Sequence, residues 1–267
     1  PMVDLKRNSR PQAMLQDPRL AKKENAWEYY FTQPDKEMFL EEVRRSRHVE
    51  EQIKSSGNTD YYIGDRDPRA DSALPVIYGA VRRNIHLQPQ LRERLFREKQ
   101  QLFLKGEKIL GVGIRAGYRA GIMNNVAIFN NHPVVGSCTA YIKEIEEKLK
   151  AWDYDSFFLA IDDRKYLEEI KKYFGESCIY LERPRSHYFQ DAINDIQNQS
   201  DDEKLIELKG VSVRQKNEDY LVELYLLARC DSLYASRGTG HNFSFLLNHD
   251  RYAHVEFTDM GEFHYKG

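Results

Sequence analysis

From residue 108 onward, short apolar segments alternate with longer amphipathic ones, and this alternation constrains the fold more than any other feature. We expect strands at 109–114, 157–161, 178–181, 230–235 and 252–257, separated by helices at 137–151, 164–174, 220–229 and 241–247. Strands separated by helices of this length favour a parallel sheet with helices on both faces. The sequence therefore predicts an α/β domain over residues 108–267.

The first 107 residues lack this alternation. Residues 1–24 are polar and rich in breakers, whereas helices are expected at 39–46, 75–83 and 88–104. We interpret residues 1–107 as the remainder of a mostly helical first domain, with the 88–104 helix as its connector to the second. Because the chain opens with Pro1 rather than Met, we expect a fragment or a processed chain.

Composition excludes several classes of protein. The net charge of −2 gives no overall positive field that would attract nucleic acid. The sequence contains no run of 18 apolar residues, so we expect no membrane-spanning helix. The three cysteines form no CxxC pair, which favours a reducing compartment over a zinc site or a disulfide framework. We expect a cytoplasmic location, and a peripheral position at the inner face of the membrane would be compatible with it.

A lone arginine follows the first expected strand, in the stretch KILGVGIRAGYR at 108–119. Ligands of open α/β sheets gather at the carboxyl ends of the strands, and Arg115 stands at such an end. Its guanidinium offers N–H donors in a fixed fork that suits a phosphate or a carboxylate. We interpret Arg115 as an anion clamp for a nucleotide pyrophosphate; the alternative is an arginine that pairs with a structural carboxylate.

The loop at 236–240 lies between an expected strand and an expected helix. Gly238 and Gly240 let the backbone approach a ligand closely, and a helix start offers unpaired N–H groups, which together suit a phosphate. Ser236 and Thr239 add hydroxyl groups, and Arg237 adds a charge. A plain tight turn is the alternative interpretation.

Glu223 lies in LVELYLLA, a helical stretch that is apolar on nearly every side. A charge in such a place needs a partner. Its carboxylate could accept the two parallel N–H groups that guanine presents on its Watson–Crick edge. Alternatively, it could lie on a narrow exposed stripe or pair with a structural arginine.

Two other features invite a ligand interpretation. Asp162 and Asp163 close an expected strand and could hold a divalent metal, although an aspartate before a helix is also an ordinary N-cap; we favour the cap. His132, before Pro133, could contact a ligand or simply precede the next helix. The other histidines lack the spacing of metal ligands.

Taken in order, five stretches resemble one family. They are ENAWEYYFTQP at 24–34, KILGVGIRAGYR at 108–119, NHP at 131–133, FFLAIDD at 157–163 and LVELYLLARCDSLYASRGTG at 221–240. The set is similar to the sugar-nucleotide half of α-1,6-type fucosyltransferases, the superfamily of the Nod-factor and N-glycan core enzymes. The resemblance is strongest to the bacterial branch associated with surface polysaccharides.

The resemblance implies a GT-B-like fold with Rossmann-like domains and transfer of fucose from GDP-fucose to a glycan hydroxyl. Transfer would be inverting, without a metal or other cofactor, and the acceptor would be an oligosaccharide or a polysaccharide. By this resemblance the catalytic residues are Arg115 and Arg119. The donor-binding residues, with Glu223 in the position of the guanine-binding carboxylate, are Arg115, His132, Glu223, Ser236, Arg237, Gly238 and Thr239.

Three positions depart from the family pattern. Gly113 stands where a histidine is common, Ala116 replaces the second arginine of an Arg-Arg pair, and Tyr118 replaces an acidic residue. No Asp or Glu occurs between Arg115 and Lys143, so the carboxylate base of some relatives has no counterpart here. A family member that binds a nucleotide or glycan without catalysis is therefore the second hypothesis. A generic nucleotide-binding α/β enzyme that uses Asp162 and Asp163 with a metal is the third.

Overall fold

A computed structural model describes residues 27–32, 68–70, 74–103, 107–116, 135–185 and 213–258. The strands are β1 (Ile109–Ile114), β2 (Ser156–Ile161), β3 (Cys178–Ile179), β4 (Ser232–Ser236) and β5 (Val255–Thr258). The helices are α2 (Trp27–Tyr30), α5 (Leu74–Asn84), α6 (Pro89–Leu102), α8 (Cys138–Trp152), α9 (Arg164–Phe174), α12 (Val213–Leu227) and α13 (Thr239–Asn248). Two short 3-10 helices, η2 (Pro68–Ala70) and η4 (Gly175–Ser177), complete the described elements.

The strands form one parallel sheet in the order β3-β2-β1-β4-β5. This is the order of the Rossmann fold, in which the chain builds outward from β1 in one direction and then returns to the other side of it. The predicted α/β fold with a parallel sheet is therefore confirmed. Its switch point, where the strand order reverses, lies between β1 and β4.

Side chains of β1 alternate between the two faces of the sheet, as a strand requires. Leu110, Val112 and Ile114 pack in a cluster with α8 and α9. The opposite face carries Gly111 and Gly113. A Cβ on Gly111 would lie 2.9 Å from Leu227 of α12, and one on Gly113 would lie 2.8 Å from His241 of α13. The two glycines therefore allow α12 and α13 to pack closely on the sheet.

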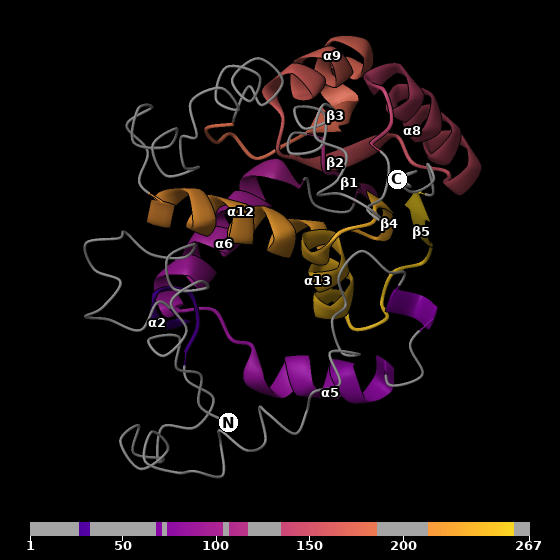
Figure 1. Cartoon of the computed structure of the whole chain (residues 1–267). Coiled ribbons are helices and arrows are strands. Elements are labelled where there is room, and N and C mark those ends of the chain that lie inside the picture. Colours follow the sequence, from indigo (N-terminus) through magenta and orange to yellow (C-terminus); the bar gives the residue numbers. More distant parts are fainter. Residues whose placement is uncertain are drawn as a thin grey trace, which may run out of the picture.

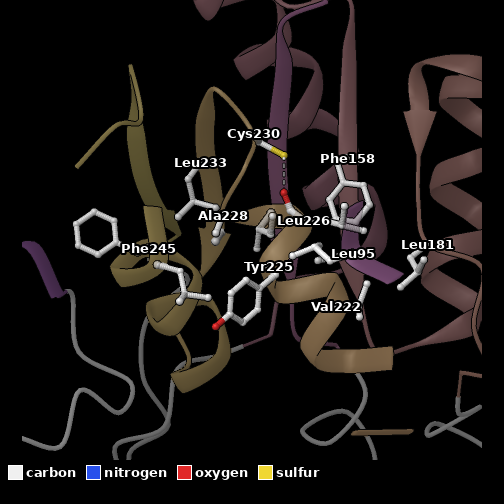
Figure 2. Close-up of a cluster of buried hydrophobic side chains, with 14 of the residues drawn as sticks. Leu95, Phe158, Leu181, Val222, Tyr225, Leu226, Ala228, Cys230, Leu233 and Phe245 are labelled. Carbon is white, nitrogen blue, oxygen red and sulfur yellow. Dashed lines mark hydrogen bonds between the residues drawn. The ribbon is translucent and has the colours of Figure 1, made fainter. Parts of the chain in front are cut away.

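The sheet is sandwiched between two helical layers, as Figure 1 shows. Helices α8 and α9 cover one face, and α12 and α13 cover the other, with α6 and α5 outside them. Figure 2 shows the core between the sheet and α12, where Phe158 and Leu233 of the strands meet Val222 and Leu226 of the helix. This core fixes how deeply α12 is buried, and so determines the surroundings of Glu223.

Two helix starts are capped by side chains, one of them by the predicted Asp163, and a third helix begins earlier than expected. Ser137 accepts a hydrogen bond from the Ala140 N–H at the start of α8, and Asp163 does the same for the Tyr166 N–H of α9. Helix α12, however, begins at Val213, seven residues before the expected start at Tyr220. Asp219, the residue before the expected start and a possible cap by its position, therefore lies inside this helix.

The described part of residues 1–107 is helical and packs onto the same core as the sheet. Tyr30, Leu87, Leu91 and Leu95 belong to the cluster that α12 and α13 share. A salt bridge of 2.6 Å between Arg94 of α6 and Asp219 of α12 ties the two helices together. The division into two domains at residue 107 stays a prediction. None of the described helices has the length and apolarity that a membrane span needs.

Candidate functional site

The switch point between β1 and β4 brings two predicted ligand-binding stretches together. Gly113 and Ala235 are paired in the parallel ladder, so both strands end side by side. Arg115 follows β1 directly, and Ser236 is the last residue of β4. Ligands of open α/β sheets bind in the crevice outside such a pair of strand ends. The topology therefore places Arg115 and the 236–240 turn where this fold binds its ligands.

Arg115 contacts the turn through both its backbone and its side chain. Its N–H donates to the Ser236 hydroxyl at 3.0 Å. A Cβ built on Gly238 would lie 3.7 Å from both Cδ and Nη1 of Arg115, so the side chain passes over this glycine. The guanidinium is half-buried and forms no hydrogen bond or ion pair with any residue that the structure describes. The alternative of pairing with a structural carboxylate is thus not seen within the described ranges.

The turn leads from the end of β4 directly into α13. Gly238 is the N-cap, so no side chain caps this helix of ten residues. The amino end of a helix carries unpaired N–H donors and the positive end of the helix dipole, which favours anions. Thr239 is exposed at the first helical position, and Arg237 is half-buried in the turn. The turn thus supplies backbone donors beside the Arg115 guanidinium.

The Ser236 hydroxyl is already used inside the protein. It is buried, accepts the Arg115 N–H and lies 3.3 Å from Nδ1 of His241. Contact of this hydroxyl with a phosphate remains a prediction. What the structure establishes is that Ser236 fixes the backbone of Arg115 against the turn.

His241 forms the floor beneath Arg115 and was missed by sequence reasoning. Its Nδ1 lies 2.8 Å from the Ser236 carbonyl oxygen, which can only accept, so Nδ1 carries the proton. The imidazole occupies the space above Gly113, which lacks a side chain. Burial lowers the pKa of His241 below its ordinary value, so the ring is neutral near pH 7. A glycine two residues before the strand-end arginine was the only sequence signal that another side chain could fill this space.

Tyr220 of α12 closes the site on the side of α13. Its hydroxyl contacts Gly240 so closely that the helix start has no room for a Cβ there. Loss of hydration raises the pKa of Tyr220 to about 12, and the positive charge of Arg115 acts in the opposite direction. This residue, like His241, was not among the predicted site residues. Its proximity to Arg115 shows that α12 reaches the same strand ends.

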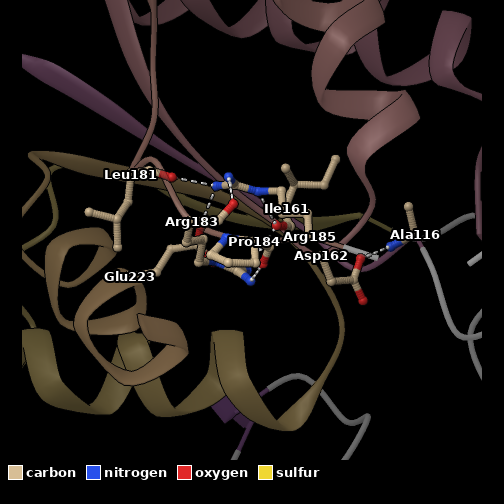
Figure 3. Close-up of polar contacts among 8 residues, drawn as sticks. All are labelled: Ala116, Ile161, Asp162, Leu181, Arg183, Pro184, Arg185 and Glu223. Carbon is tan, nitrogen blue, oxygen red and sulfur yellow. Dashed lines mark hydrogen bonds and ion pairs between the residues drawn. The ribbon is translucent and has the colours of Figure 1, made fainter. Parts of the chain in front are cut away.

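Glu223 is buried in α12 and is bound by two arginines that follow β3, as Figure 3 shows. Its Oε2 accepts from Nη2 of Arg183 at 2.6 Å, and its Oε1 accepts from Nη2 of Arg185 at 2.9 Å. The structure thus contains the arginine pairing that the sequence left open for this carboxylate. Contact of Glu223 with guanine stays a prediction. It would require the two carboxylate oxygens to accept further hydrogen bonds in addition to those from Arg183 and Arg185.

Sequence reasoning missed Arg183 and Arg185 because they lie in a stretch without clear periodicity. Both donate to the carbonyl oxygen of Ile161, the last residue of β2. A usable signal was present: a buried glutamate needs a cation, and two arginines flank Pro184 just after a strand end. The carboxyl ends of β2 and β3 are therefore joined to α12 by charge.

The two aspartates after β2 have separate structural roles. Asp163 is the N-cap of α9, and Asp162 accepts the Ala116 N–H at 2.8 Å, which links β2 to the residue after Arg115. Within the described ranges, no group of three or more His, Cys, Asp or Glu side chains could hold a metal. The predicted residues Arg119 and His132 lie outside the described residues.

Comparison with known proteins gives similarity at the level of structure only. No protein-family model and no curated protein matches the chain. Among solved structures, NodZ fucosyltransferase from Bradyrhizobium is 16% identical, with a TM-score of 0.39, over 67% of this chain and 47% of that one. NodZ α-1,6-fucosyltransferase soaked with GDP-fucose is 16% identical, with a TM-score of 0.46, over 88% and 78%. POFUT1 in complex with GDP is 12% identical, with a TM-score of 0.41, over 69% and 50%.

These similar proteins are fucosyltransferases, the class that the sequence motifs resemble. The chain spans less than half the length of the first NodZ structures, between 43% and 47% of each. Because every TM-score given above is below 0.5, we assign function from the chain's own residues and motifs.

Proposed function

We propose that the chain is a glycosyltransferase domain that binds a GDP-sugar, GDP-fucose foremost, at the carboxyl ends of β1 and β4. The observation that carries this proposal is the Arg115 guanidinium, which has no hydrogen-bond or ion-pair partner among the described residues and lies against the glycine N-cap of α13 at the switch point. A fixed cationic fork beside an uncapped helix start suits a diphosphate. The motif resemblance supplies the finer assignment to guanine and fucose.

In the proposed reaction, an acceptor hydroxyl oxygen bonds to the anomeric carbon of fucose while the bond from that carbon to the β-phosphate oxygen breaks. GDP leaves with the bonding electrons, and the hydroxyl proton passes to a base. Arg115 and the α13 N–H groups would stabilise the negative charge that develops on the departing diphosphate. Arg119, placed by the resemblance beside the reacting groups, would support the same charge. The acceptor is an oligosaccharide or a polysaccharide.

The remaining predicted donor residues take subsidiary roles in this proposal. Thr239 and Arg237 would line the phosphates at the α13 start, and His132 would contact the donor from outside the described residues. Glu223 would contribute by holding Arg183 and Arg185 beside the site. The proposed reaction uses no metal, as the motif resemblance implies; Asp163 caps α9, and Asp162 accepts the Ala116 N–H.

Transfer of radiolabelled fucose tests the proposal. The chain is incubated with labelled GDP-fucose, EDTA and a mixture of oligosaccharides and polysaccharide fragments, and incorporation of label is measured. We expect incorporation that EDTA does not reduce and that Arg115→Ala lowers at least about tenfold, the effect of one charge-assisted hydrogen bond. The absence of both GDP-fucose binding and incorporation would overturn the proposal.

The same assay separates catalysis from simple binding. The lack of any Asp or Glu between Arg115 and Lys143 favours a binding module as the second candidate function. GDP-fucose binding in calorimetry without incorporation of label into any acceptor would support this second function. Incorporation above the level of a boiled control would exclude it.

A further inference from the structure

The two arginines on Glu223 differ in how many of their N–H groups are used. Arg185 donates to four acceptors: Nε to Ile161 O, Nη1 to Arg183 O, and Nη2 to both Leu181 O and Glu223 Oε1, at 2.8–3.3 Å. All three of its nitrogens are engaged, and its side chain is only 1% exposed. This arginine is a structural residue whose donors are satisfied by the protein itself.

Arg183 uses only one nitrogen fully. Its Nη2 donates to Ile161 O at 2.9 Å and to Glu223 Oε2 at 2.6 Å. Its Nη1 lies 3.5 Å from the Pro184 carbonyl oxygen, too far for a strong hydrogen bond, and its buried Nε has no partner. The side chain is nevertheless only 6% exposed. Buried donors without acceptors are costly and rare, so the spare N–H groups of Arg183 need an explanation.

Charge points to an anion as the missing partner. Two guanidinium groups share the single carboxylate of Glu223, so each is paired with only one of its oxygens. Asp162 acts electrostatically on Arg183, but its Oδ1 is held by the Ala116 N–H. Adding Arg115, which has no described ion-pair partner, makes this edge of the sheet cationic.

Position places Arg183 beside the proposed diphosphate site. The Asp162–Ala116 hydrogen bond joins the β2 end, to which Arg183 is bonded, with the residue that follows Arg115. The positive charges of Arg115 and Arg183 both act on the Tyr220 hydroxyl and favour a lower pKa for it. The β2 end thus connects the segment of Arg183 with the segment of Arg115.

We propose that Arg183 is a second anion-binding residue of this site, which donates through Nε and Nη1 to a phosphate group while Glu223 holds it through Nη2. The ligand class is a diphosphate, and Arg115 and Arg183 bind its two ends. In the assignment to a GDP-sugar this inference rests on the proposed function, but the diphosphate contact itself does not require the nucleotide. Glu223 is then a positioning residue.

The test compares Arg183→Lys with Arg185→Lys in calorimetric titrations with inorganic pyrophosphate. Both variants keep the positive charge and can still pair with Glu223, but only Arg183→Lys removes donors that lack a protein acceptor. We expect Arg183→Lys to weaken pyrophosphate binding at least about tenfold. We expect Arg185→Lys to change it less than about threefold, since its donors serve the protein. Equal losses in the two variants, or none in either, would overturn the inference.

Titration of the unaltered chain with GDP separates this inference from the proposed function. Pyrophosphate binding that depends on Arg183, without any GDP binding, would overturn the GDP-sugar assignment and support the anion site. If the unaltered chain binds GDP and Arg183→Lys binds pyrophosphate as tightly as the unaltered chain, the GDP-sugar assignment is supported and the anion site at Arg183 is overturned. Should Arg183→Lys fail to fold, the Nε–H signal of Arg183 in NMR spectra of the unaltered chain decides. A shift on addition of pyrophosphate supports the inference, and an unchanged signal overturns it.

Discussion

Two regions at the carboxyl edge of the same sheet differ in whether their arginines are paired with a carboxylate of the protein. At β2 and β3, Arg183 and Arg185 are buried against Glu223, and the protein supplies the counter-charge. At β1 and β4, Arg115 is half-buried beside a glycine turn and has no described counter-charge. The first arrangement fixes α12 to the sheet through Glu223, whereas the second holds an arginine without a described protein partner.

The difference follows from burial. A fully buried charge must be paired, because desolvation of an isolated ion costs several kcal/mol. An arginine at a half-buried strand end keeps contact with water and can stay unpaired until an anion replaces that water. The comparison therefore predicts a large loss of stability when Glu223 is removed from the first strand end and a small loss when Arg115 is removed from the second.

The largest effect on stability is expected from Glu223→Leu. The substitution leaves two buried guanidinium groups without their carboxylate, which should lower the free energy of unfolding by about 3–5 kcal/mol. Urea denaturation measures the change. The matched control on α12 is Glu218→Gln, whose partner Arg214 is 48% exposed and whose loss should cost less than about 1 kcal/mol.

A triple variant sharpens this test. Replacing Arg183 and Arg185 by methionine together with Glu223→Leu removes all three charges at once. Buried ion pairs replaced by apolar side chains are often neutral or stabilising, so most of the lost stability should return. If Glu223→Leu alone is as stable as the unaltered chain, the ion-paired cluster does not hold this strand end together.

A smaller loss is expected from Gly113→Ala at the other strand end. The added Cβ would lie 2.8 Å from Cδ2 of His241, so the imidazole or the strand must shift. Overpacking of this kind typically lowers the free energy of unfolding by about 1–3 kcal/mol. The loss should shrink in the background of His241→Ala, where the space is open. Equal losses in both backgrounds would show that the imidazole does not fill the space above Gly113.

The pH dependence of stability tests the same histidine. Burial lowers the pKa of His241 in the folded chain, so the unfolded chain binds its proton first as the pH falls through about 6.5. Stability should therefore be fully present above this pH and decline below it. His241→Asn, which keeps a donor for the Ser236 carbonyl, should flatten the decline between pH 8 and pH 5. Part of the slope should remain, because burial also lowers the pKa of His249. An unchanged slope in the variant would contradict the neutral, buried imidazole.

The smallest effect on stability is expected from Arg115→Ala. Because the guanidinium has no described partner, its removal should change the free energy of unfolding by less than about 0.5 kcal/mol. Urea denaturation beside Glu223→Leu measures both ends of the comparison in one experiment. A loss above about 2 kcal/mol would show that Arg115 is structural after all.

The two strand ends also differ in how far the sequence predicts them. The β1 and β4 ends were predictable because strand–helix alternation implies a right-handed parallel sheet, and adjacent strand ends then share an edge. Arg115 and the 236–240 turn are local features that need only this rule. Asp163 as the cap of α9 is likewise a local signal.

The partners of Glu223 were not predictable in the same way. Arg183 and Arg185 lie 40 and 38 residues away, beyond a strand of only two residues and without periodicity of their own. The sequence shows that a buried carboxylate needs a cation but not which of its 40 lysines and arginines supplies it. His241 and Tyr220 were missed because only the packing of α12 and α13 brings them over the glycines.

Isothermal titration of GDP into the unaltered chain, Arg115→Ala and the exposed control Arg97→Ala tests the central claim most directly. We predict that Arg115→Ala weakens GDP binding at least about tenfold while its urea midpoint stays unchanged, and that Arg97→Ala matches the unaltered chain. Equal GDP affinity in all three proteins would contradict a diphosphate site at the β1 and β4 ends.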